Sequence, residues 1–361
     1  MKSHHRNQVF FSVLFCFFVL ACQIPIASGL PFLPLTATQK PTSTATQTLT
    51  PTLTLTTTAT QTATQTSTPT LTETSTKSPT PTQTPTLPPM TRRVVIVSID
   101  GLRPEAIFLA PMPNVAGLLQ SGAFSLGART VFPSVTLVAH ASMLTGMCPS
   151  KHGVDWNDYL PERGYAQGTD LFDLAHAAGL QTDMYVGKKK MIQLTEPSSL
   201  DRFVLNDSDS ALMDDLIADF PQDFGVLFIH LLETDVAGHA YGWLSPEQLN
   251  VIHRADEVVG RLLAELDARN LRGETLIMIT ADHGGHDQSH GSDSREDMTI
   301  PWIATGPGIQ PKTLTTSVHT MDTAATAAFA LGFAIPPEWD GVPVYEAFGL
   351  AVEKQSVECQ Y

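Results

Sequence analysis

The sequence is short of basic residues, of cysteines and of long apolar runs. Its 361 residues include 21 Lys and Arg against 36 Asp and Glu, which gives a formal net charge of −15. Residues 1–90 carry a net charge of +3, so −18 falls on residues 91–361. This balance argues against a basic surface for nucleic-acid duplexes, although it is compatible with carboxylate-rich cation sites. The four cysteines, at positions 16, 22, 148 and 359, do not form the pattern of a disulfide framework.

The first 22 residues have the pattern of an export signal. Lys2 and Arg6 precede an apolar run over residues 9–21, which is as long as a signal-peptide core and too short to span a bilayer comfortably. The run ends in V-L-A-C, which resembles the lipobox of bacterial lipoproteins and implies lipidation of Cys22. Cleavage near residues 27–29 and secretion is the alternative. We therefore expect an exported protein that is anchored to the extracytoplasmic face of a membrane through acyl chains on Cys22, or is secreted.

Residues 23–90 form a low-complexity linker rich in Thr and Pro. Over residues 36–89, Thr occupies nearly every second position, with Pro, Ser, Gln, Ala and Leu between. The alternation could suggest a strand, but the intervening residues supply no continuous apolar face and Pro removes backbone donors. We expect a disordered, extended stalk that reaches on the order of 150 Å at about 3.1 Å per residue. One domain of catalytic size remains, residues 91–361.

Within that domain, buried-strand patterns alternate with helical patterns. Apolar runs predict strands over residues 93–99, 223–229 and 275–280. Helical spacing predicts helices over residues 112–121, 136–145, 170–178, 209–219, 246–269 and 322–331. This alternation predicts an α/β fold with a doubly wound, mostly parallel sheet flanked by helices. In such sheets ligands bind beyond the carboxyl ends of the strands.

Acidic residues and histidines stand at those strand ends. A lone Asp after a strand is usually a helix cap, and a lone His is more often a core residue. Here three predicted strands each lead to such residues at the same rim of the sheet. Oxygen and nitrogen ligands without Cys suit zinc in a hydrolytic site, with manganese or iron as alternatives. The residues concerned are Asp100 after the first strand, Asp235 and His239 after the second, and Asp282, His283 and His290 after the third.

Thr136 falls where an extended segment gives way to a predicted helix. Its hydroxyl would lie at the positive end of that helix, where a developing anion is favoured. From the local sequence alone, a helix N-cap is the other interpretation. The neighbouring rim of Asp and His favours a nucleophile.

Taken together, these motifs resemble the alkaline phosphatase superfamily, most closely its nucleotide pyrophosphatase/phosphodiesterase branch. The matching segments are D-G-L-R from Asp100, F-P-x-x-T-x-x-x-H over residues 132–140, H-G-V-D-W-N over residues 152–157, D-x-x-G-H from Asp235, D-H-G from Asp282 and H-G-x-D from His290. The resemblance implies that Asp100, Asp282, His283 and Thr136 bind one metal ion. It places the second ion at Asp235, His239 and His290. It also implies that Thr136 is the nucleophile and that Asn157 helps to hold a phosphoryl oxygen.

The implied protein is a metal-dependent hydrolase of small phosphate esters, of the phosphodiesterase or nucleotide pyrophosphatase type. Its cofactors would be two divalent ions, Zn first and Mn or Fe as alternatives, and its intermediate a phosphothreonine. Within the superfamily, a phosphomonoesterase or a phosphonate hydrolase is the alternative. A tethered binding protein without catalysis is the alternative from another class. The oligomeric state is not implied.

Departures from the branch's pattern limit what the resemblance transfers. Leu137 follows the nucleophile where nucleotide-cleaving relatives place an aromatic residue, so we expect weak discrimination among nucleobases. No C-x-P-S-R or S-x-P-S-R segment of the sulfatase branch occurs, and no third metal site is evident. Trp156 and Tyr159 flank Asn157 and could line the substrate entrance or pack at the rim. Residues 188–190 are three consecutive lysines, most simply a solvated loop, with steering of an anionic substrate as the alternative.

Four further histidines invite comparison with the predicted ligands. His286 is the alternative to His290 as a metal ligand. His140 and His152 belong to family motifs, and we expect both to make structural hydrogen bonds. His319 is expected to be a packing residue.

Overall fold

The computed structural model describes residues 89–351 and 356–360. The predicted export signal, Cys22 and the stalk up to residue 88 lie outside the described residues. In the part of the chain that is described, no helix combines the length and the apolarity needed to cross a membrane.

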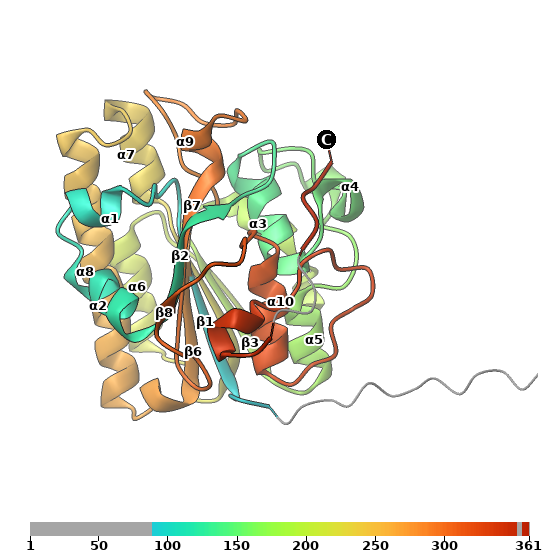
Figure 1. The fold of residues 1–361 in the computed structure, drawn as a ribbon. Coiled ribbons are helices and arrows are strands. Elements are labelled where there is room, and N and C mark those ends of the chain that lie inside the picture. The colour runs from blue at the N-terminus through green and yellow to red at the C-terminus, as the bar shows by residue number, and fades with distance from the viewer. Residues whose placement is uncertain (1–88, 352–355, 361) are drawn as a thin grey trace, which may run out of the picture. The chain divides into compact units, whose positions relative to one another are not determined.

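The centre of the domain is an eight-stranded sheet with the strand order β4-β3-β5-β1-β6-β7-β2-β8 (Figure 1). Neighbouring strands are parallel except at β6–β7 and β7–β2, so β7 alone runs against the other described strands. This confirms a mostly parallel sheet. The strands are β1 (Arg93–Ile99), β2 (Ala123–Arg129), β3 (Gln181–Val186), β4 (Arg202–Leu205), β5 (Phe224–Leu231), β6 (Thr275–Thr280), β7 (Thr299–Thr305) and β8 (Lys312–Thr313).

The three strands at the middle of the sheet are those that the apolar runs predict. β1 lies between β5 and β6, with Val95 opposite Leu227 on one side and Ile277 on the other. All residues of β5 and β6, and all of β1 except Arg93, are buried. Parallel strands covered on both faces read as continuous Val, Ile and Leu runs, which is why the sequence reveals them. Their carboxyl ends lie together at one edge.

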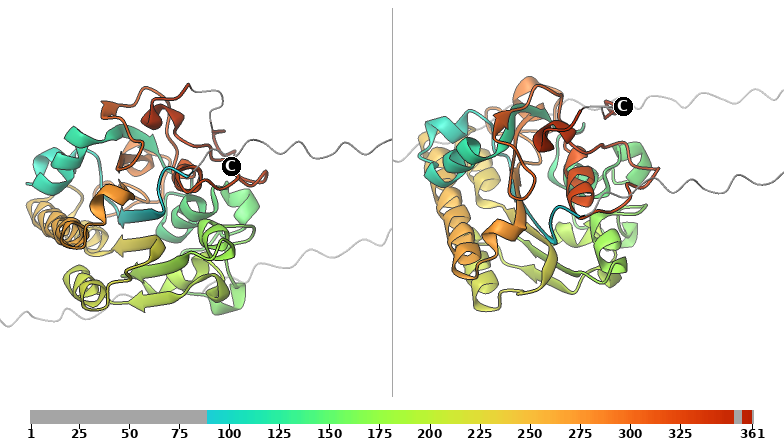
Figure 2. Two further views of the ribbon diagram at one scale, coloured as in Figure 1. Left: turned by 90° about the horizontal axis from the view of Figure 1, so that it is seen from below. Right: turned by 60° about the horizontal axis from the view of Figure 1, so that its bottom comes forward.

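Helices cover both faces of the sheet, as Figure 1 and the turned views of Figure 2 show. In Figure 1, α1, α2, α6, α7 and α8 lie on the left of the sheet, and α3, α4, α5 and α10 on the right. The helices are α1 (Ala106–Leu109), α2 (Pro113–Ser121), α3 (Thr136–Thr145), α4 (Pro149–His152), α5 (Leu171–Ala177), α6 (Asp209–Ala218), α7 (Glu233–Tyr241), α8 (Pro246–Ala268), α9 (Arg295–Met298) and α10 (Asp322–Ala330). The six predicted helices are confirmed with shifts of at most one residue at either end.

Local sequence fixes the ends of the helices that matter most. α8 starts with Pro246 at its first position, and the hydroxyl of Ser245 accepts a hydrogen bond from Gln248 N at 3.2 Å. α3 begins at Thr136 directly after Val135 in an extended conformation, and all ten of its residues are buried. Thr136 is therefore the first helical residue and not the N-cap.

The described residues contain one disulfide that the cysteine pattern did not predict. Cys148 and Cys359 form a disulfide with their Cα atoms 5.5 Å apart. They are separated by 211 residues, so nothing in their spacing marks them as partners. The bond joins the start of α4 to the C-terminal segment, residues 356–360. In the same segment, Ser356 Oγ is hydrogen-bonded to His319 Nδ1.

Candidate active site

Asp100 follows β1 directly and is completely buried. Its Oδ2 lies 2.8 Å from His230 Nε2 and 2.6 Å from Lys188 Nζ. The hydroxyl of Thr234 donates to the Asp100 backbone carbonyl. These contacts fix the carboxylate at the carboxyl edge of the sheet.

The second pair of predicted ligands lies one helical turn apart on α7, which starts two residues after β5 ends. Asp235 is buried, and its Oδ1 lies 3.4 Å from His239 Nε2 and 3.6 Å from His290 Nε2. A spacing of four residues places both side chains on the same face of the helix.

The loop after β6 supplies the remaining predicted ligands. Asp282 and His283 are completely buried. Asp282 Oδ1 accepts hydrogen bonds from Gly101 N at 3.1 Å and from His283 N at 3.0 Å, so its other oxygen is turned to the site. His290 stacks on His283, with the ring centroids 3.7 Å apart.

The three predicted histidine ligands share one arrangement. In each, Nδ1 contacts a backbone carbonyl: that of Gln288 for His239, of Gly284 for His283 and of Ser134 for His290, at 2.8 to 2.9 Å. A carbonyl only accepts, so Nδ1 carries the proton and Nε2 keeps its lone pair. Each Nε2 then faces a carboxylate of the site. A hydrogen bond from Nδ1 to a carbonyl is typical of histidines that bind metal through Nε2, because it fixes the orientation of the ring.

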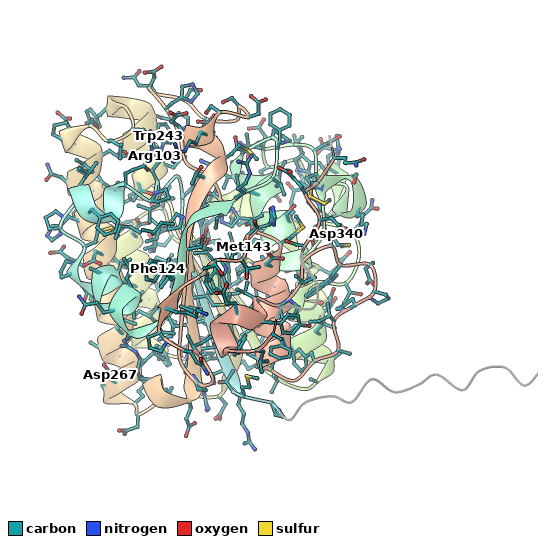
Figure 3. All side chains as sticks on the ribbon, in the orientation of Figure 1. Arg103, Phe124, Met143, Trp243, Asp267 and Asp340 are labelled. Carbon is teal, nitrogen blue, oxygen red and sulfur yellow. A yellow bond between two sulfur atoms is a disulfide. The ribbon has the colours of Figure 1, made fainter. Side chains whose placement is uncertain are left out.

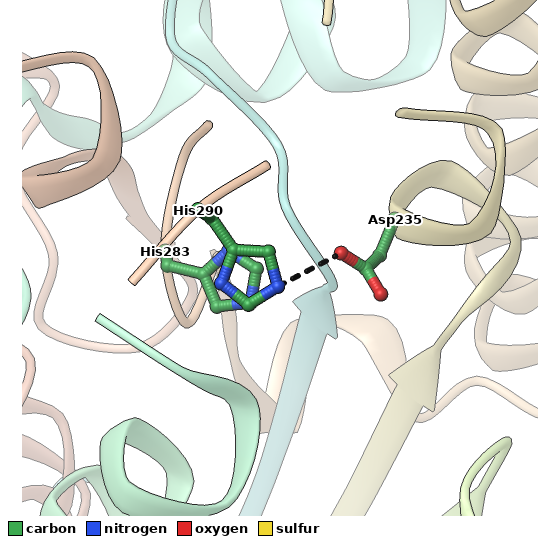
Figure 4. A group of neighbouring side chains, drawn as sticks. All are labelled: Asp235, His283 and His290. Carbon is green, nitrogen blue, oxygen red and sulfur yellow. Dashed lines mark ion pairs between the residues drawn. The ribbon is translucent and has the colours of Figure 1, made fainter. Parts of the chain in front are cut away.

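Two groups of these side chains could hold a metal ion. Asp100, Asp282 and His283 form one, and Asp235, His283 and His290 form the other, which Figure 4 shows. All ligand atoms of a group lie within 4.8 Å of one another. His239 lies outside both groups but reaches Asp235. Asp100 Oδ1, Asp235 Oδ1, Asp282 Oδ2 and His283 Nε2 are buried and have no hydrogen-bond partner among the described residues. Buried polar atoms are normally satisfied, so these four fit cation ligands.

Charges within the site shift the pKa of several groups. Burial works to raise the pKa of the Asp100 carboxyl, but the Lys188 ammonium and the contact with His230 outweigh it and hold that pKa well below its ordinary value. Burial and the charge of Asp100 raise the pKa of Asp282 well above its ordinary value. Burial also lowers the pKa of His283. The imidazole therefore stays neutral, which is the form that binds metal.

Thr136 and Asn157 meet at the start of α3. The Thr136 side chain is buried, and its hydroxyl lies 3.3 Å from Lys188 Nζ. Asn157 Oδ1 accepts hydrogen bonds from Leu137 N at 2.9 Å and from Lys190 Nζ at 2.8 Å. The first turn of the helix thus brings together the predicted nucleophile and the predicted phosphoryl-binding amide.

The interpretation of residues 188–190 as a solvated loop is wrong for two of the three lysines. Lys188 has a side chain only 17% exposed, and its Nζ bridges Asp100 at 2.6 Å and Asp235 at 2.7 Å. Lys190 contacts Asn157, whereas Lys189 is exposed. These lysines follow β3, a strand that was not predicted from the sequence. The apolar pattern of residues 184–186 before Gly187 was the signal that could have placed them at the same rim.

Comparison with known families identifies the family of this chain. A family model described as type I phosphodiesterase / nucleotide pyrophosphatase matches residues 94–298. The chain belongs to this family. The match runs from β1 to the end of α9 and spans every predicted metal ligand, together with Thr136 and Asn157.

Individual members of the phosphodiesterase family are distant. The venom phosphodiesterase CdcPDE of Crotalus durissus collilineatus is 27% identical over 216 residues, 53% of this chain and 26% of that protein. Ectonucleotide pyrophosphatase/phosphodiesterase family member 3 of Rattus norvegicus is 28% identical over 214 residues, 53% of this chain and 24% of that protein. The chain thus spans about a quarter of the length of these relatives.

Solved structures show the same fold. Murine ectonucleotide pyrophosphatase / phosphodiesterase 5, solved as an inactive variant with AMP, has a TM-score of 0.61 at 16% identity. The similarity covers 72% of this chain and 99% of that one. A phosphonate monoester hydrolase from Silicibacter pomeroyi has a TM-score of 0.58 at 15% identity, with 72% and 77% covered. At these identities the likeness concerns the alkaline phosphatase-like fold alone.

In this phosphodiesterase-family chain, Trp243 packs between the strand-end motifs. Its Nε1 donates to Gly101 O at 2.8 Å, and its ring lies 5.2 Å from that of His239 and 5.8 Å from that of His290. A Cβ on Gly285 would lie 2.1 Å from the Trp243 ring, so only glycine fits there. Arg103 also reaches Gly285, donating to its carbonyl at 3.2 Å, and Figure 3 labels both side chains. Glycines such as Gly101 and Gly285 let the segments that carry the predicted ligands pack directly against the Trp243 indole.

The other histidines lie where their predicted roles require. His140 contacts Thr136 O and Ser98 Oγ, and His152 contacts Ser142 Oγ, so both make the structural hydrogen bonds that we expect. His286 Nδ1 lies 2.7 Å from Asp297 Oδ1 and belongs to neither ligand group. His319 contacts Asp322 and Ser356 and belongs to neither ligand group.

Proposed function

We propose that this protein is a metal-dependent phosphoric ester hydrolase of the phosphodiesterase/pyrophosphatase type, with Thr136 as its nucleophile. The observation that carries the proposal is the position of the Lys188 ammonium. It lies 3.3 Å from the Thr136 hydroxyl and within 2.7 Å of both Asp100 and Asp235. The nucleophile and a carboxylate from each proposed ligand set therefore meet at one point.

The residues fit two divalent ions. Asp100, Asp282 and His283, with Thr136, would hold one, and Asp235, His239 and His290 the other. Carboxylate and imidazole ligands suit zinc, with manganese or iron as alternatives. Two such ions would supply Lewis-acid stabilisation of the attacking and leaving oxygens of an in-line displacement. The four unsatisfied ligand atoms support this assignment.

The chain's own groups carry the reaction in two displacements. The Thr136 hydroxyl gives up its proton to solvent, and its oxygen forms a bond to phosphorus while the bond to the leaving alcohol or phosphate breaks. Water then cleaves the phosphothreonine and restores the Thr136 hydroxyl. Thr136 is the first residue of α3, so the helix N-terminus favours the negative charge that develops there. With its oxygen held by Leu137 N and Lys190, Asn157 has its amide N–H groups left to donate to a phosphoryl oxygen.

We propose a small phosphate ester as substrate and little discrimination among nucleobases. Leu137 is completely buried, so the position that follows the nucleophile offers no exposed surface for a base. The family membership favours diesters and pyrophosphates over monoesters. Phosphomonoester or phosphonate hydrolysis is the alternative within the same site.

We further propose that the domain works outside the cytoplasm. Similar proteins are named as venom enzymes and ectonucleotide pyrophosphatases, and the Cys148–Cys359 disulfide suits an oxidising compartment. The V-L-A-C segment would anchor the protein through Cys22. Cys22→Ser should then release it from membranes or block its processing. Unchanged partitioning into detergent would exclude the lipid anchor.

The nucleophile is tested with bis-p-nitrophenyl phosphate as substrate. Thr136→Ala should lower turnover by about 10⁴-fold or more, as removal of other covalent nucleophiles does, while most of the bound metal is retained. Thr136→Ser, the matched variant that keeps the hydroxyl, should retain part of the activity. A trapped covalent phosphate on any other residue would refute the assignment.

A further inference from the structure

Lys190 is a largely covered cation that has no ion-pair partner among the described residues. Its Nζ donates to Asn157 Oδ1 at 2.8 Å. Across residues 89–351 and 356–360, no carboxylate oxygen lies within 4.0 Å of that Nζ. Lys188, two residues earlier, has both Asp100 and Asp235 as partners. The carboxylates of Asp100, Asp282 and Asp235 act on Lys190 only from beyond 4.0 Å. Covering an ammonium without an anion in direct contact is unfavourable, so the position of Lys190 calls for a closer anion.

The segment that carries Lys190 is anchored. It belongs to a 3₁₀-helix over Lys189–Leu194, in which Met191 and Leu194 are buried in the core. The buried Gln193 side chain contacts Leu160 N and O and the carbonyl of Gly164 at 2.7 to 2.8 Å. The same short helix therefore holds the loop that follows Asn157. As a result, the side chains of Lys190 and Asn157 are held next to each other.

Asn157 defines where the anion would lie. Two donors contact its Oδ1, Leu137 N and Lys190 Nζ, so the oxygen is assigned by its partners. An ammonium has three N–H groups, and Asn157 takes one of them. The remaining donors of Lys190 lie beside the amide that we propose to hold a phosphoryl oxygen.

The charges of the site lead to the same conclusion. With two divalent ions bound, Asp100, Asp235 and Asp282 would carry three negative charges and the ions four positive ones. This leaves one net positive charge, enough for a phosphodiester monoanion. Lys188 and Lys190 raise the net charge to three. A substrate with one negative charge would leave two positive charges uncompensated at the reacting phosphorus.

We propose that Lys190, assisted by Lys188, selects substrates that carry a second negative charge at or next to the phosphorus attacked by Thr136. This inference rests on the proposed function. The second charge can come from another ionised oxygen on the same phosphorus or from an adjacent phosphate in a pyrophosphate. The chemistry shared by both is a dianionic group within reach of the Lys190 ammonium.

The test compares three probes on the metal-loaded full-length protein. Methyl p-nitrophenyl phosphate has one negative charge. p-Nitrophenyl phosphate has the same leaving group and two charges at about pH 8, because the second pKa of a phosphomonoester is about 6. Symmetrical dimethyl pyrophosphate carries its second charge on the neighbouring phosphorus. For each probe, kcat/KM of wild type is divided by that of the variant, so differences between leaving groups cancel.

Lys190→Gln is expected to lower kcat/KM about 10- to 100-fold for at least one of the two-charge probes, as loss of a charge-assisted hydrogen bond would. The loss for the one-charge probe should stay within about threefold. Which two-charge probe is affected identifies the source of the second charge. Lys190→Arg keeps the charge and should recover part of the selectivity. Lys189→Gln is the matched control, because it removes an equal charge from an exposed side chain that lies over the Tyr159 ring.

Binding of inorganic phosphate, measured by calorimetry, gives a readout that does not depend on turnover. Lys190→Gln should weaken it by a similar factor, and Lys189→Gln should not. An equal loss for all three probes, or the same effect from both variants, would overturn the inference and leave Lys190 as a support for Asn157. Failure of the wild type to hydrolyse any probe would instead refute the proposed function.

Discussion

The imidazole rings of His283 and His290 stack on each other, with their planes inclined by 14°. Their Nδ1 atoms are held by the carbonyls of Gly284 and Ser134, so both Nε2 atoms face the carboxylates of the site. Burial and the neighbouring His283 lower the pKa of His290 to about 4. Both rings are therefore neutral near pH 7, and two stacked neutral imidazoles that face acids form a ready metal-ligand pair.

The first prediction distinguishes the two candidate histidines of the β6–α9 loop. His290→Ala should reduce the metal content from about two equivalents to about one, because it removes a ligand from the group that contains Asp235. His286→Ala should leave the metal content unchanged, since His286 contacts Asp297 instead. Elemental analysis after gel filtration measures both. The reverse pattern would make His286 the ligand, and fewer than two equivalents in active wild-type protein would exclude a two-metal site.

The second prediction concerns Trp243, which we treat as a positioning residue. Trp243→Phe removes the hydrogen bond to Gly101 O and leaves a gap beside His239 and Gly285. Changes in such supporting contacts typically weaken metal affinity 10- to 100-fold, and we expect a loss of about that size. A competition titration with a chelator measures it without reference to turnover. Trp156→Phe is the control, because Trp156 packs against Arg163 and is not among the ring contacts of the ligand histidines. Equal effects from both variants would contradict a specific role for Trp243.

The parts of the site that the sequence predicts are those carried by local patterns. Asp100 comes directly after β1 and Asp282 two residues after β6, and both strands are largely apolar, so a strand pattern and its end locate the two residues. Asp235 and His239 are one helical turn apart, which is also a local relation. Because parallel strands end at one edge, three local patterns are enough to assemble most of the site.

What the sequence could not provide depends on contacts between distant segments. Lys190 and Asn157 are 33 residues apart and belong to different loops, and no periodicity links them. Trp243 contacts Gly101 across 142 residues. The antiparallel β7 was also missed, because Pro301 interrupts its short apolar run and a proline argues against a central strand.

The third prediction concerns the disulfide. Cys359→Ser should lower the free energy of unfolding by about 2–5 kcal/mol, the usual effect of removing a native disulfide. The bond closes a loop of 211 residues and holds the C-terminal segment to the start of α4. Denaturant unfolding measures the change. A reductant should destabilise the wild type by a similar amount and leave Cys359→Ser unaffected. Equal sensitivity of both proteins to the reductant would show that the bond is not formed in solution.

The fourth prediction is a dependence of stability on pH that arises from Glu346. Its carboxylate accepts hydrogen bonds from Thr315 N and Oγ1 and from Thr316 N and Oγ1, and lies 3.0 Å from Lys312 Nζ. Burial works to raise the pKa of Glu346, but the contacts with Thr316, Lys312 and Thr315 outweigh it, so the folded-state pKa lies below the ordinary value of 4.5. The unfolded chain therefore binds the proton more readily than the folded one.

This sign determines the expected result. The stabilisation by Glu346 is fully present above the unfolded-state pKa and is lost as the pH falls through the folded-state pKa. Wild type should exceed Glu346→Gln in free energy of unfolding at pH 7, and the difference should shrink as the pH is lowered below 4.5. Groups that titrate alike in both proteins cancel in the difference. Glu358→Gln, which removes an exposed carboxylate paired only loosely with Arg129 at 3.8 Å, should change the free energy by less than about 0.5 kcal/mol at either pH. A difference between wild type and Glu346→Gln that grows on acidification would contradict the assignment, because it would require a folded-state pKa above that of the unfolded chain.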